Sequence, residues 1–457
     1  MAATETPRKT PAKAAIASWI GTTLEYYDFA VYGTASALVL NVLFFSKELD
    51  PGISTLLSMA TLAVGYAVRP LGAFILGPLA DKFGRKFVMM LTLFGIGGCT
   101  FLIGCLPTFQ QVGALAPILL VVIRIIQGLC VSGEQGSAIT MSLEHASEKR
   151  RGFITSFTTS GSASGGLLAT GVFIPFAALP QEQLLDWAWR VPFWLSAVVV
   201  VAAYIIRRKL EEPPVFLETQ AIKVQMAPLK QALRFHWASI ARVAACALIA
   251  GVSYVFDSFS VAFATTGYHL DKPTMLWVGV VTSMIAIFVT PLAGMLSDRI
   301  GRKAVFLIGA IGAGALMVPY LWSITTGTWP LIFTLGILCK AFCYSTVNAA
   351  WPAFFAEMFP SRVRASGLTV GTQIGFAIAG GIAPVLSTAL AGDDLQNWFG
   401  PAMFAVVITV IAVIAALTAK ETRSYTLAEI DDLQQSEREK AAVTAATVLP
   451  VAAKPAS

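Results

Sequence analysis

Seven ionisable side chains interrupt long apolar stretches of this sequence. They are Glu25, Asp28, Arg69, Arg124, Glu134, Asp257 and Lys340. An ionisable group inside a membrane span is costly, and it usually faces a polar cavity or a partner of opposite charge. A carboxyl group there can switch between charged and neutral forms, because burial disfavours the charge and a nearby arginine favours it. We therefore interpret the acidic members as candidates for proton coupling: Glu25, Asp28, Glu134 and Asp257.

The basic members Arg124 and Lys340 predict a site for an anion. The offset between the acidic residues that end the fourth and tenth spans places the counterpart of Arg124 at position 337, one helical turn from Lys340. Two cations facing one cavity would hold a carboxylate. The alternatives are an ion pair between Lys340 and Asp257 and a static pair that fastens Arg124 to the first span. With neighbouring polar side chains, the predicted substrate-binding set is Arg124, Lys340, Tyr32, Tyr254, Tyr344, Asn348 and Gln373.

The elements that must carry these residues are membrane-spanning helices. Of the 457 residues 56% are hydrophobic and 13% are charged, and the mean hydropathy is +0.72, which is far too apolar for an ordinary soluble protein. The predicted fold is all-α, with twelve transmembrane helices in two pseudo-symmetric bundles of six. A span needs about 20 mostly apolar residues, and the qualifying stretches are 16–45, 54–79, 87–107, 113–142, 152–178, 189–206, 241–267, 274–297, 304–325, 329–355, 366–390 and 398–419.

Charge distribution sets the predicted topology. Most of the 32 Lys and Arg fall in loops on one side, which the positive-inside rule assigns to the cytoplasm, so both termini are expected inside a cell (inner) membrane. A polar segment divides the chain into halves. The predicted parts are a cytoplasmic N-terminal tail (1–15), the first six-helix bundle (16–206), a cytoplasmic linker (207–240), the second bundle (241–420) and a disordered cytoplasmic tail (421–457).

One charged motif occurs in both halves and indicates a duplication. The segment GPLADKFGRK begins at Gly77, and GMLSDRIGRK begins at Gly294. The glycines allow close packing and a tight turn, and each aspartate can pair with an arginine. We interpret the motif as a cytoplasmic gate that joins helices in one conformation and separates in the other; the alternative is that its basic residues only set topology. With the glutamates that end the fourth and tenth spans, the gating set is Gly77, Asp81, Gly84, Arg85, Glu144, Gly294, Asp298, Gly301, Arg302 and Glu357.

Several other classes of function are disfavoured. The six cysteines lie in apolar runs without the spacing of a disulfide or metal site, so no metal and no cofactor are expected. The three histidines lie at or outside span ends, which argues against an enzyme. No Walker motif supports ATP-driven pumping. The net charge of +6 reflects topology rather than nucleic-acid binding.

The two halves, each with the motif after its second span, resemble the major facilitator superfamily. Three further stretches resemble its metabolite:proton symporter family: LEYYDFAVYG from Leu24, RPLG from Arg69, and the fourth-span segment from Arg124 to Gly136. Members of that family carry shikimate, α-ketoglutarate, citrate, or proline and betaine. The resemblance implies two bundles that rock about a central site.

These features together predict a proton-coupled secondary active transporter that imports a small organic acid, such as a mono- or dicarboxylate or a shikimate-like metabolite. The expected partners are an anionic substrate, protons and the lipid bilayer, with the proton gradient as driving force and a monomer as the functional unit. The alternative is proton-coupled uptake of a zwitterionic compatible solute such as proline or betaine. The tail counts against it, because its heptad pattern stops after Leu433.

Overall fold

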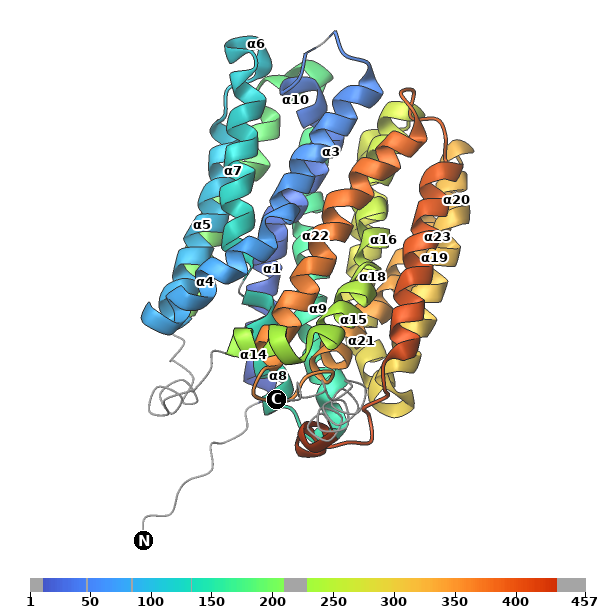
Figure 1. The fold of residues 1–457 in the computed structure, drawn as a ribbon. Coiled ribbons are helices and arrows are strands. Elements are labelled where there is room, and N and C mark those ends of the chain that lie inside the picture. Colours follow the sequence, from blue (N-terminus) through green and yellow to red (C-terminus); the bar gives the residue numbers. More distant parts are fainter. Residues whose placement is uncertain (1–10, 47, 84, 133, 209–227, 434–457) are drawn as a thin grey trace, which may run out of the picture.

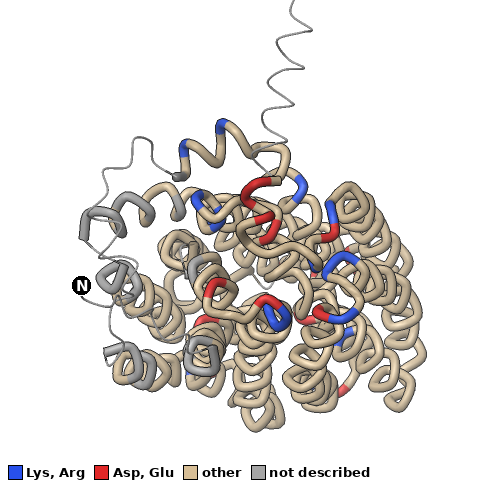
Figure 2. The backbone as a smooth tube through the Cα atoms, turned by 90° about the horizontal axis from the view of Figure 1, so that it is seen from below, with Lys and Arg blue, Asp and Glu red and all other residues tan. Residues whose placement is uncertain are grey.

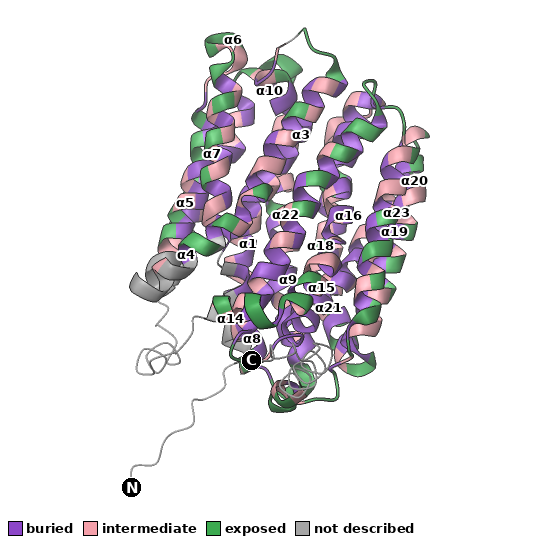
Figure 3. Ribbon diagram, viewed as in Figure 1, coloured by how far each residue is buried: buried purple, intermediate pink, exposed green. Residues whose placement is uncertain are grey.

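The structure, a computed structural model, describes residues 11–46, 48–83, 85–132, 134–208 and 228–433. These residues form helices joined by short loops, and no strand occurs among them. Buried residues face the interior, and exposed residues lie on outer helix faces (Figure 3). Phe288 and Val198, on the outer surface, are 67% and 64% exposed. A broad apolar outer surface suits a bilayer, so the predicted all-α membrane fold is confirmed.

The first half is coloured blue to green in Figure 1. Its second predicted span is two helices, α3 and α4, separated at Val68, because Pro70 lacks the backbone donor that would continue one ladder. The elements of this half are α1 (Pro11–Ala35), η1 (Ser36–Leu40), α2 (Asn41–Leu43), α3 (Pro51–Ala67), α4 (Arg69–Phe83), α5 (Arg85–Cys105), α6 (Phe109–Val112), α7 (Leu115–Val131), α8 (Glu134–His145), η2 (Glu148–Arg150), α9 (Arg151–Ala177), α10 (Gln181–Asp186), η3 (Ala188–Arg190), α11 (Val191–Trp194) and α12 (Ser196–Arg208).

The second half runs from yellow-green to red beside the first (Figure 1). Helical pieces join end to end here, so that α20, η6 and α21 form one span, Trp329–Ala356. Seven helical runs of the described residues are long and apolar enough to cross a bilayer. The elements are α14 (Pro228–Phe235), α15 (Trp237–Ala247), α16 (Ala250–Tyr254), η4 (Val255–Phe259), α17 (Ser260–Ala262), η5 (Phe263–Gly267), α18 (Lys272–Ile300), α19 (Arg302–Thr325), α20 (Trp329–Gly336), η6 (Ile337–Tyr344), α21 (Ser345–Ala356), α22 (Arg364–Ala391) and α23 (Phe399–Thr418).

Four of these elements, η1, η4, η5 and η6, are π-helical. They lie in the first, seventh and tenth spans, which are three of the spans that carry ionisable residues. A π segment inserts a residue into the helical repeat and rotates the side chains that follow it, and such segments are frequent at functional sites. The sequence patterns gave no indication of them.

The longest contacts between the halves are α9 with α18 and α3 with α22, and α9 also packs against α21. The Ser160 hydroxyl donates to the Ile287 carbonyl oxygen at 2.9 Å, and the Thr159 hydroxyl donates to the Asn348 carbonyl oxygen at 2.8 Å. At the opposite end from the charged motif, the Gly52 amide donates to the Asp393 carbonyl oxygen at 3.0 Å. The two bundles thus meet at both ends and enclose a central space.

Residues 421–433 begin the segment that was predicted to be a disordered tail, and they are ordered. They pack on the end of the bundle that carries the motif of the second half, here called the motif end. Thr426 and Glu429 exchange hydrogen bonds as a capping box, so a short helix follows. Charged groups on neighbouring elements hold this segment in place, which composition alone did not indicate. Most of the predicted linker, residues 209–227, lies outside the described residues.

Candidate functional site

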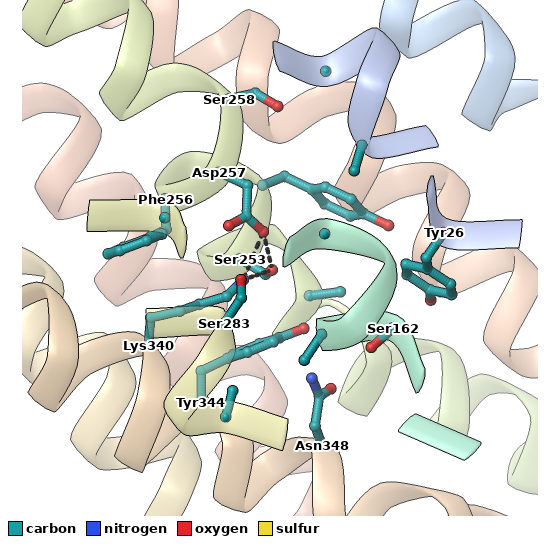
Figure 4. A pocket seen from close by; sticks show the side chains of 18 of the residues that line it. Tyr26, Ser162, Ser253, Phe256, Asp257, Ser258, Ser283, Lys340, Tyr344 and Asn348 are labelled. Carbon is teal, nitrogen blue, oxygen red and sulfur yellow. Dashed lines mark hydrogen bonds and ion pairs between the residues drawn. The ribbon is translucent and has the colours of Figure 1, made fainter. Parts of the chain in front are cut away.

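A central cavity lies between the halves. The first half contributes residues of α1, α3 and α9, and the second half contributes residues of the seventh to eleventh spans. Five of the predicted site residues line it: Tyr254, Asp257, Lys340, Tyr344 and Asn348. The close-up shows Tyr26 and Ser162 of the first half opposite Lys340, Tyr344 and Asn348 of the second (Figure 4). The cavity therefore presents both polar and aromatic groups to a bound molecule.

Lys340 and Asp257 form an ion pair on the cavity wall (Figure 4). Their Nζ and Oδ2 atoms are 2.6 Å apart. Ser253 lies between them, because its hydroxyl donates to Asp257 Oδ2 at 2.8 Å and accepts a short hydrogen bond from Lys340. The Asp257 side chain is 49% exposed and that of Lys340 is 12% exposed. The pairing that competed with the two-cation hypothesis is thus present, and it faces the cavity.

The π segments place this pair. Asp257 lies in η4 and Lys340 in η6, while Ser253 lies four residues before Asp257 on the same helical face. The Lys340 ammonium also lies 4.8 Å from the centroid of the Tyr344 ring and 5.6 Å from that of Phe256. Aromatic faces attract a cation, so these rings help to hold the ammonium in the cavity.

An aromatic wall covers the side of the cavity formed by α1 and α3. Tyr66 of α3 meets Tyr254 of the second half with ring centroids 4.9 Å apart, and Phe29 lies 5.6 Å from Tyr66. Behind this wall the Arg69 guanidinium stacks 4.2 Å from the Tyr66 centroid and 4.1 Å from that of Phe29. A Cβ on Gly380 would lie 2.6 Å from the Tyr66 ring, so glycine is required there. Arg69 thus supports the aromatic wall.

Arg124 does not face the cavity, contrary to the two-cation hypothesis. It is fully buried within the first half, where it donates to Gln127 Oε1 at 2.5 Å and to the Leu62 carbonyl oxygen at 3.4 Å. Its guanidinium lies 3.9 Å from the centroid of Tyr32. Arg124 and position 337, one helical turn from Lys340, correspond in depth, but depth along a span does not determine the direction in which a side chain points. Packing against Tyr32 and Gly65 turns Arg124 inward.

The other predicted site residues also lie away from the cavity lining. Tyr32 is fully buried and its hydroxyl lies 2.5 Å from that of Thr61, and Gln373 of α22 is buried. Asp28 and Glu25 are buried in α1. Asp28 hydrogen-bonds with Thr100, which also accepts a bond of 2.8 Å from Gln127, the partner of Arg124. The Glu134 side chain lies outside the described part of the chain.

We expect Arg124→Lys to affect stability rather than binding. Lysine lacks the planar group that bonds Gln127 and stacks on Tyr32, so unfolding in detergent should become easier by about 1–3 kcal/mol. Arg242→Lys is the matched control, because Arg242 is only partly buried and its guanidinium bonds Thr418 among the described residues. Substrate affinity of the folded Arg124 variant should stay within about threefold of wild type. Lost affinity with an unchanged melting temperature would show that Arg124 contacts the substrate.

The motif of the second half forms a buried charged cluster at the motif end. Acidic and basic residues lie side by side there when the bundle is viewed from below (Figure 2). Arg302 lies 2.9 Å from Asp298 and 3.5 Å from Glu357. Glu357 also pairs at 3.1 Å with Arg151, which belongs to the first half, and accepts a short bond from Thr422. The cluster therefore joins the two halves.

Asp298 also binds the start of α9 in the other half. Its carboxylate accepts the Gly152 amide at 2.8 Å and the Phe153 amide at 2.9 Å. Unpaired amides and the helix dipole make a helix N-terminus favourable for an anion. The approach is close, because a Cβ on Gly152 would lie 2.2 Å from Ser297 Oγ and one on Gly294 would lie 2.5 Å from Ser156 Oγ. Gly294 thus packs against the opposite half.

Two further charged contacts complete the motif end. Gly301 has φ of 113°, which favours glycine in this turn, and Glu421 accepts the next two amides, of Arg302 and Lys303, at 3.1 and 3.0 Å. Glu144 lies 3.7 Å from Arg364 of the second half. The equivalent contacts of the first motif are not described, because Gly84 and the side chains of Gly77, Asp81 and Arg85 lie outside the described residues.

Comparison with known proteins identifies the family. Residues 243–453 match the model of the Major Facilitator Superfamily, and residues 13–228 match that of sugar (and other) transporters. The shikimate transporter of Escherichia coli (strain K12) is 32% identical over 90% of this chain and 95% of its own length. The chain belongs to the major facilitator superfamily. It is a multi-pass membrane transporter rather than an enzyme, as the sequence motifs predicted.

Other superfamily members agree with this placement. The glycine betaine/proline/ectoine/pipecolic acid transporter of Dickeya dadantii (strain 3937) is 30% identical over 91% of this chain and 84% of that protein. The proton:xylose symporter XylE, solved with 6-bromo-6-deoxy-D-glucose, superimposes with a TM-score of 0.71 at 20% identity, covering 93% of this chain and 99% of that one. The major facilitator fold, with twelve helices in two bundles of six, is therefore confirmed.

Several cavity residues of this superfamily member were missed by sequence reasoning. Ser253 could have been predicted as a cavity residue from its spacing, because it precedes Asp257 by one helical turn. Tyr66 carried no such signal, since one tyrosine in an apolar helix is usually part of the core. Other hydroxyl groups of the lining belong to helices whose rotation the sequence did not determine, among them Tyr26, Thr159, Ser162 and Ser283.

Proposed function

We propose that this transporter carries a small organic acid into the cell together with protons. The observation that carries the proposal is the Lys340 ammonium on the wall of the central cavity, paired with Asp257 at 2.6 Å. A mostly buried ammonium binds a carboxylate by a strong, charge-assisted hydrogen bond, and the neighbouring aspartate can accept a proton. Asp257 belongs to the seventh span and Lys340 to the tenth. The pair therefore lies within one bundle, beside the surface at which the bundles meet.

The remaining lining favours an acid that also carries hydroxyl groups. Serine, threonine and tyrosine hydroxyls from both halves surround the ion pair, and Asn348 adds an amide. Such groups discriminate by hydrogen bonds, because an analogue without the matching hydroxyl leaves them unpaired. The 32% identity to a shikimate transporter is consistent with this class of substrate. We therefore place a shikimate-like acid ahead of a simple aliphatic dicarboxylate.

The test is substrate-induced proton uptake by the purified protein in sealed lipid vesicles. A dye inside the vesicles reports pH while mono-, di- and tricarboxylates, shikimate, proline and betaine are added outside. We expect shikimate or another acid to acidify the lumen, and a protonophore to abolish the signal. Protein-free vesicles control for diffusion of the neutral acid across the bilayer. Acidification by zwitterions alone would contradict the proposal.

The second candidate is a zwitterionic compatible solute such as proline or betaine. The aromatic wall of Phe29, Tyr66 and Tyr254 favours it, because ring faces bind quaternary ammonium groups. The loss of Arg124 from the cavity lining also leaves Lys340 as the cation on which selection of an anion depends. If this candidate is correct, betaine should inhibit the proton uptake that every other substrate induces in the same vesicle assay. The organic acid remains our first choice because the wall lacks a described acidic group beyond Asp257.

We further propose that the motif end is the cytoplasmic face and that its cluster is the gate. Basic residues are concentrated there, in agreement with the positive-inside rule. Arg151, Asp298 and Glu357 join the halves through buried contacts that must separate before the cavity can open on that side. Both termini are then cytoplasmic, the six-helix bundles are 16–206 and 241–420, and one chain suffices for transport.

A further inference from the structure

The Asp257 carboxylate occupies the place that a substrate carboxylate needs. Oδ2 of Asp257 accepts both the Ser253 hydroxyl and the Lys340 ammonium. The Lys340 side chain is only 12% exposed, whereas the aspartate in front of it is 49% exposed. A ligand that enters the cavity therefore meets Asp257 first. Access to the full ammonium requires the aspartate to release it.

We propose that Asp257 is an internal competitor for Lys340, so that its carboxylate and the substrate carboxylate bind the same ammonium in turn. This inference rests on the proposed function and adds the step that couples substrate binding to protonation. When Asp257 takes up one proton its charge is lost, its bond to Lys340 weakens, and the substrate carboxylate replaces it. When the substrate leaves, Asp257 gives up the proton and binds Lys340 again.

Electrostatic repulsion prevents Asp257 and the substrate carboxylate from binding Lys340 at the same time. Two carboxylates on one ammonium would place like charges a few ångströms apart, which disfavours ionisation of both. A monoanionic substrate together with one proton leaves the charge of the site unchanged. Each carboxylate bound at Lys340 therefore brings one proton to Asp257. The proton and substrate sites lie in the same half, so the coupling does not require the halves to separate.

Among the described residues that line the cavity, no second acidic side chain could take the role of Asp257. The phenols of Tyr320 and Tyr344 and the thiol of Cys339 lie within electrostatic reach of it, and such groups are neutral near pH 7. Of the elements packed against η4, α1 contributes the Tyr26 phenol to the cavity, and the described cavity lining of α22 has no charged group. Lys340 is the one charged side chain among the described residues of this lining besides Asp257.

The test compares wild type with Asp257→Asn, which keeps the shape and the hydrogen bond from Ser253. Shikimate binding is measured in detergent from about pH 6 to about pH 9, and proton uptake and counterflow are measured in vesicles. In wild type the Kd should rise with pH, approaching about tenfold per unit where binding is accompanied by uptake of one full proton. The variant should bind shikimate with a Kd that does not change with pH. It should exchange shikimate by counterflow but take up one proton fewer per molecule.

Controls make the outcomes distinct. Asp271→Asn removes an acid of the same half that caps α18 outside the cavity, and it should keep the wild-type pH dependence. Counterflow by Asp257→Asn shows that the variant is folded; if counterflow is absent, Asp257→Glu should restore it along with pH dependence. An unchanged pH dependence and proton ratio in Asp257→Asn would overturn the inference. Failure of the proposed function would instead show as wild type binding neither shikimate, α-ketoglutarate nor citrate, and it would overturn the inference as well.

Discussion

Replacement of Lys340 by glutamine is expected to abolish concentrative uptake of organic acids and to weaken their binding by about a hundredfold. The variant removes the positive charge of the cavity wall and leaves Asp257 without its partner at 2.6 Å. Water can then solvate the Asp257 carboxylate, because its side chain is half exposed. The fold should therefore survive. Binding of radiolabelled shikimate to purified protein measures the loss.

A matched variant separates loss of the site from loss of charge. Lys272 begins α18 in the same half and does not line the cavity, so Lys272→Gln removes the same charge elsewhere. It should bind shikimate as wild type does. Lys340→Arg keeps the charge but replaces a compact ammonium with a wider planar group, so we expect partial binding with altered selectivity. Wild-type affinity in Lys340→Gln would show that the carboxylate binds elsewhere.

Sequence reasoning succeeded where local spacing restricts the answer. The apolar stretches determine the number of spans, because each crossing needs a minimum length of helix. The motif of the second half places Asp298 four residues before Arg302, across the turn at Gly301, and the structure shows the contact between them at 2.9 Å. Lys340 and Asp257 were paired as an alternative hypothesis because a buried cation usually needs a nearby acid. None of these inferences required knowledge of helix rotation.

The direction of side chains could not be predicted in the same way. Arg124 and position 337 correspond in depth, but depth along a span does not determine which face meets the cavity. Packing against Tyr32 and Gly65 directs Arg124 into the first half. In the tenth span, the π segment η6 changes the rotation from Ile337 onward, so Lys340 does not follow the pattern of a regular helix.

The sequence patterns also did not predict the contacts between the halves. The motif suggested that Asp298 pairs with arginines, and it does, yet its carboxylate also accepts two amides of α9. Nothing in the motif identifies a helix start in the other half as a partner. The internal repeat places equivalent residues at equivalent positions within each half, whereas the closing contact joins residues that are not equivalent.

Replacement of Gly152 by leucine is expected to hold the motif end open and to reduce net uptake by at least about tenfold. Even a Cβ at this position would lie 2.2 Å from Ser297 Oγ and 2.9 Å from the Gly294 carbonyl oxygen, so α9 and α18 must separate. Their separation breaks the bonds from Gly152 and Phe153 to Asp298. The open state is then favoured because only the closed state contains the clash.

The measurement is access to the cavity from the motif end. A cysteine in place of Asn348, in a background without the native cysteines, lines the cavity and reports labelling by a membrane-impermeant maleimide in inside-out vesicles. Gly152→Leu should raise the labelling rate by about tenfold, and Gly171→Leu on the same helix should not, because no atom lies within 4 Å of a Cβ at Gly171. Equal labelling in both variants would refute the gate. Slower labelling in Gly152→Leu would place the gate at the opposite end, where Gly52 meets Asp393.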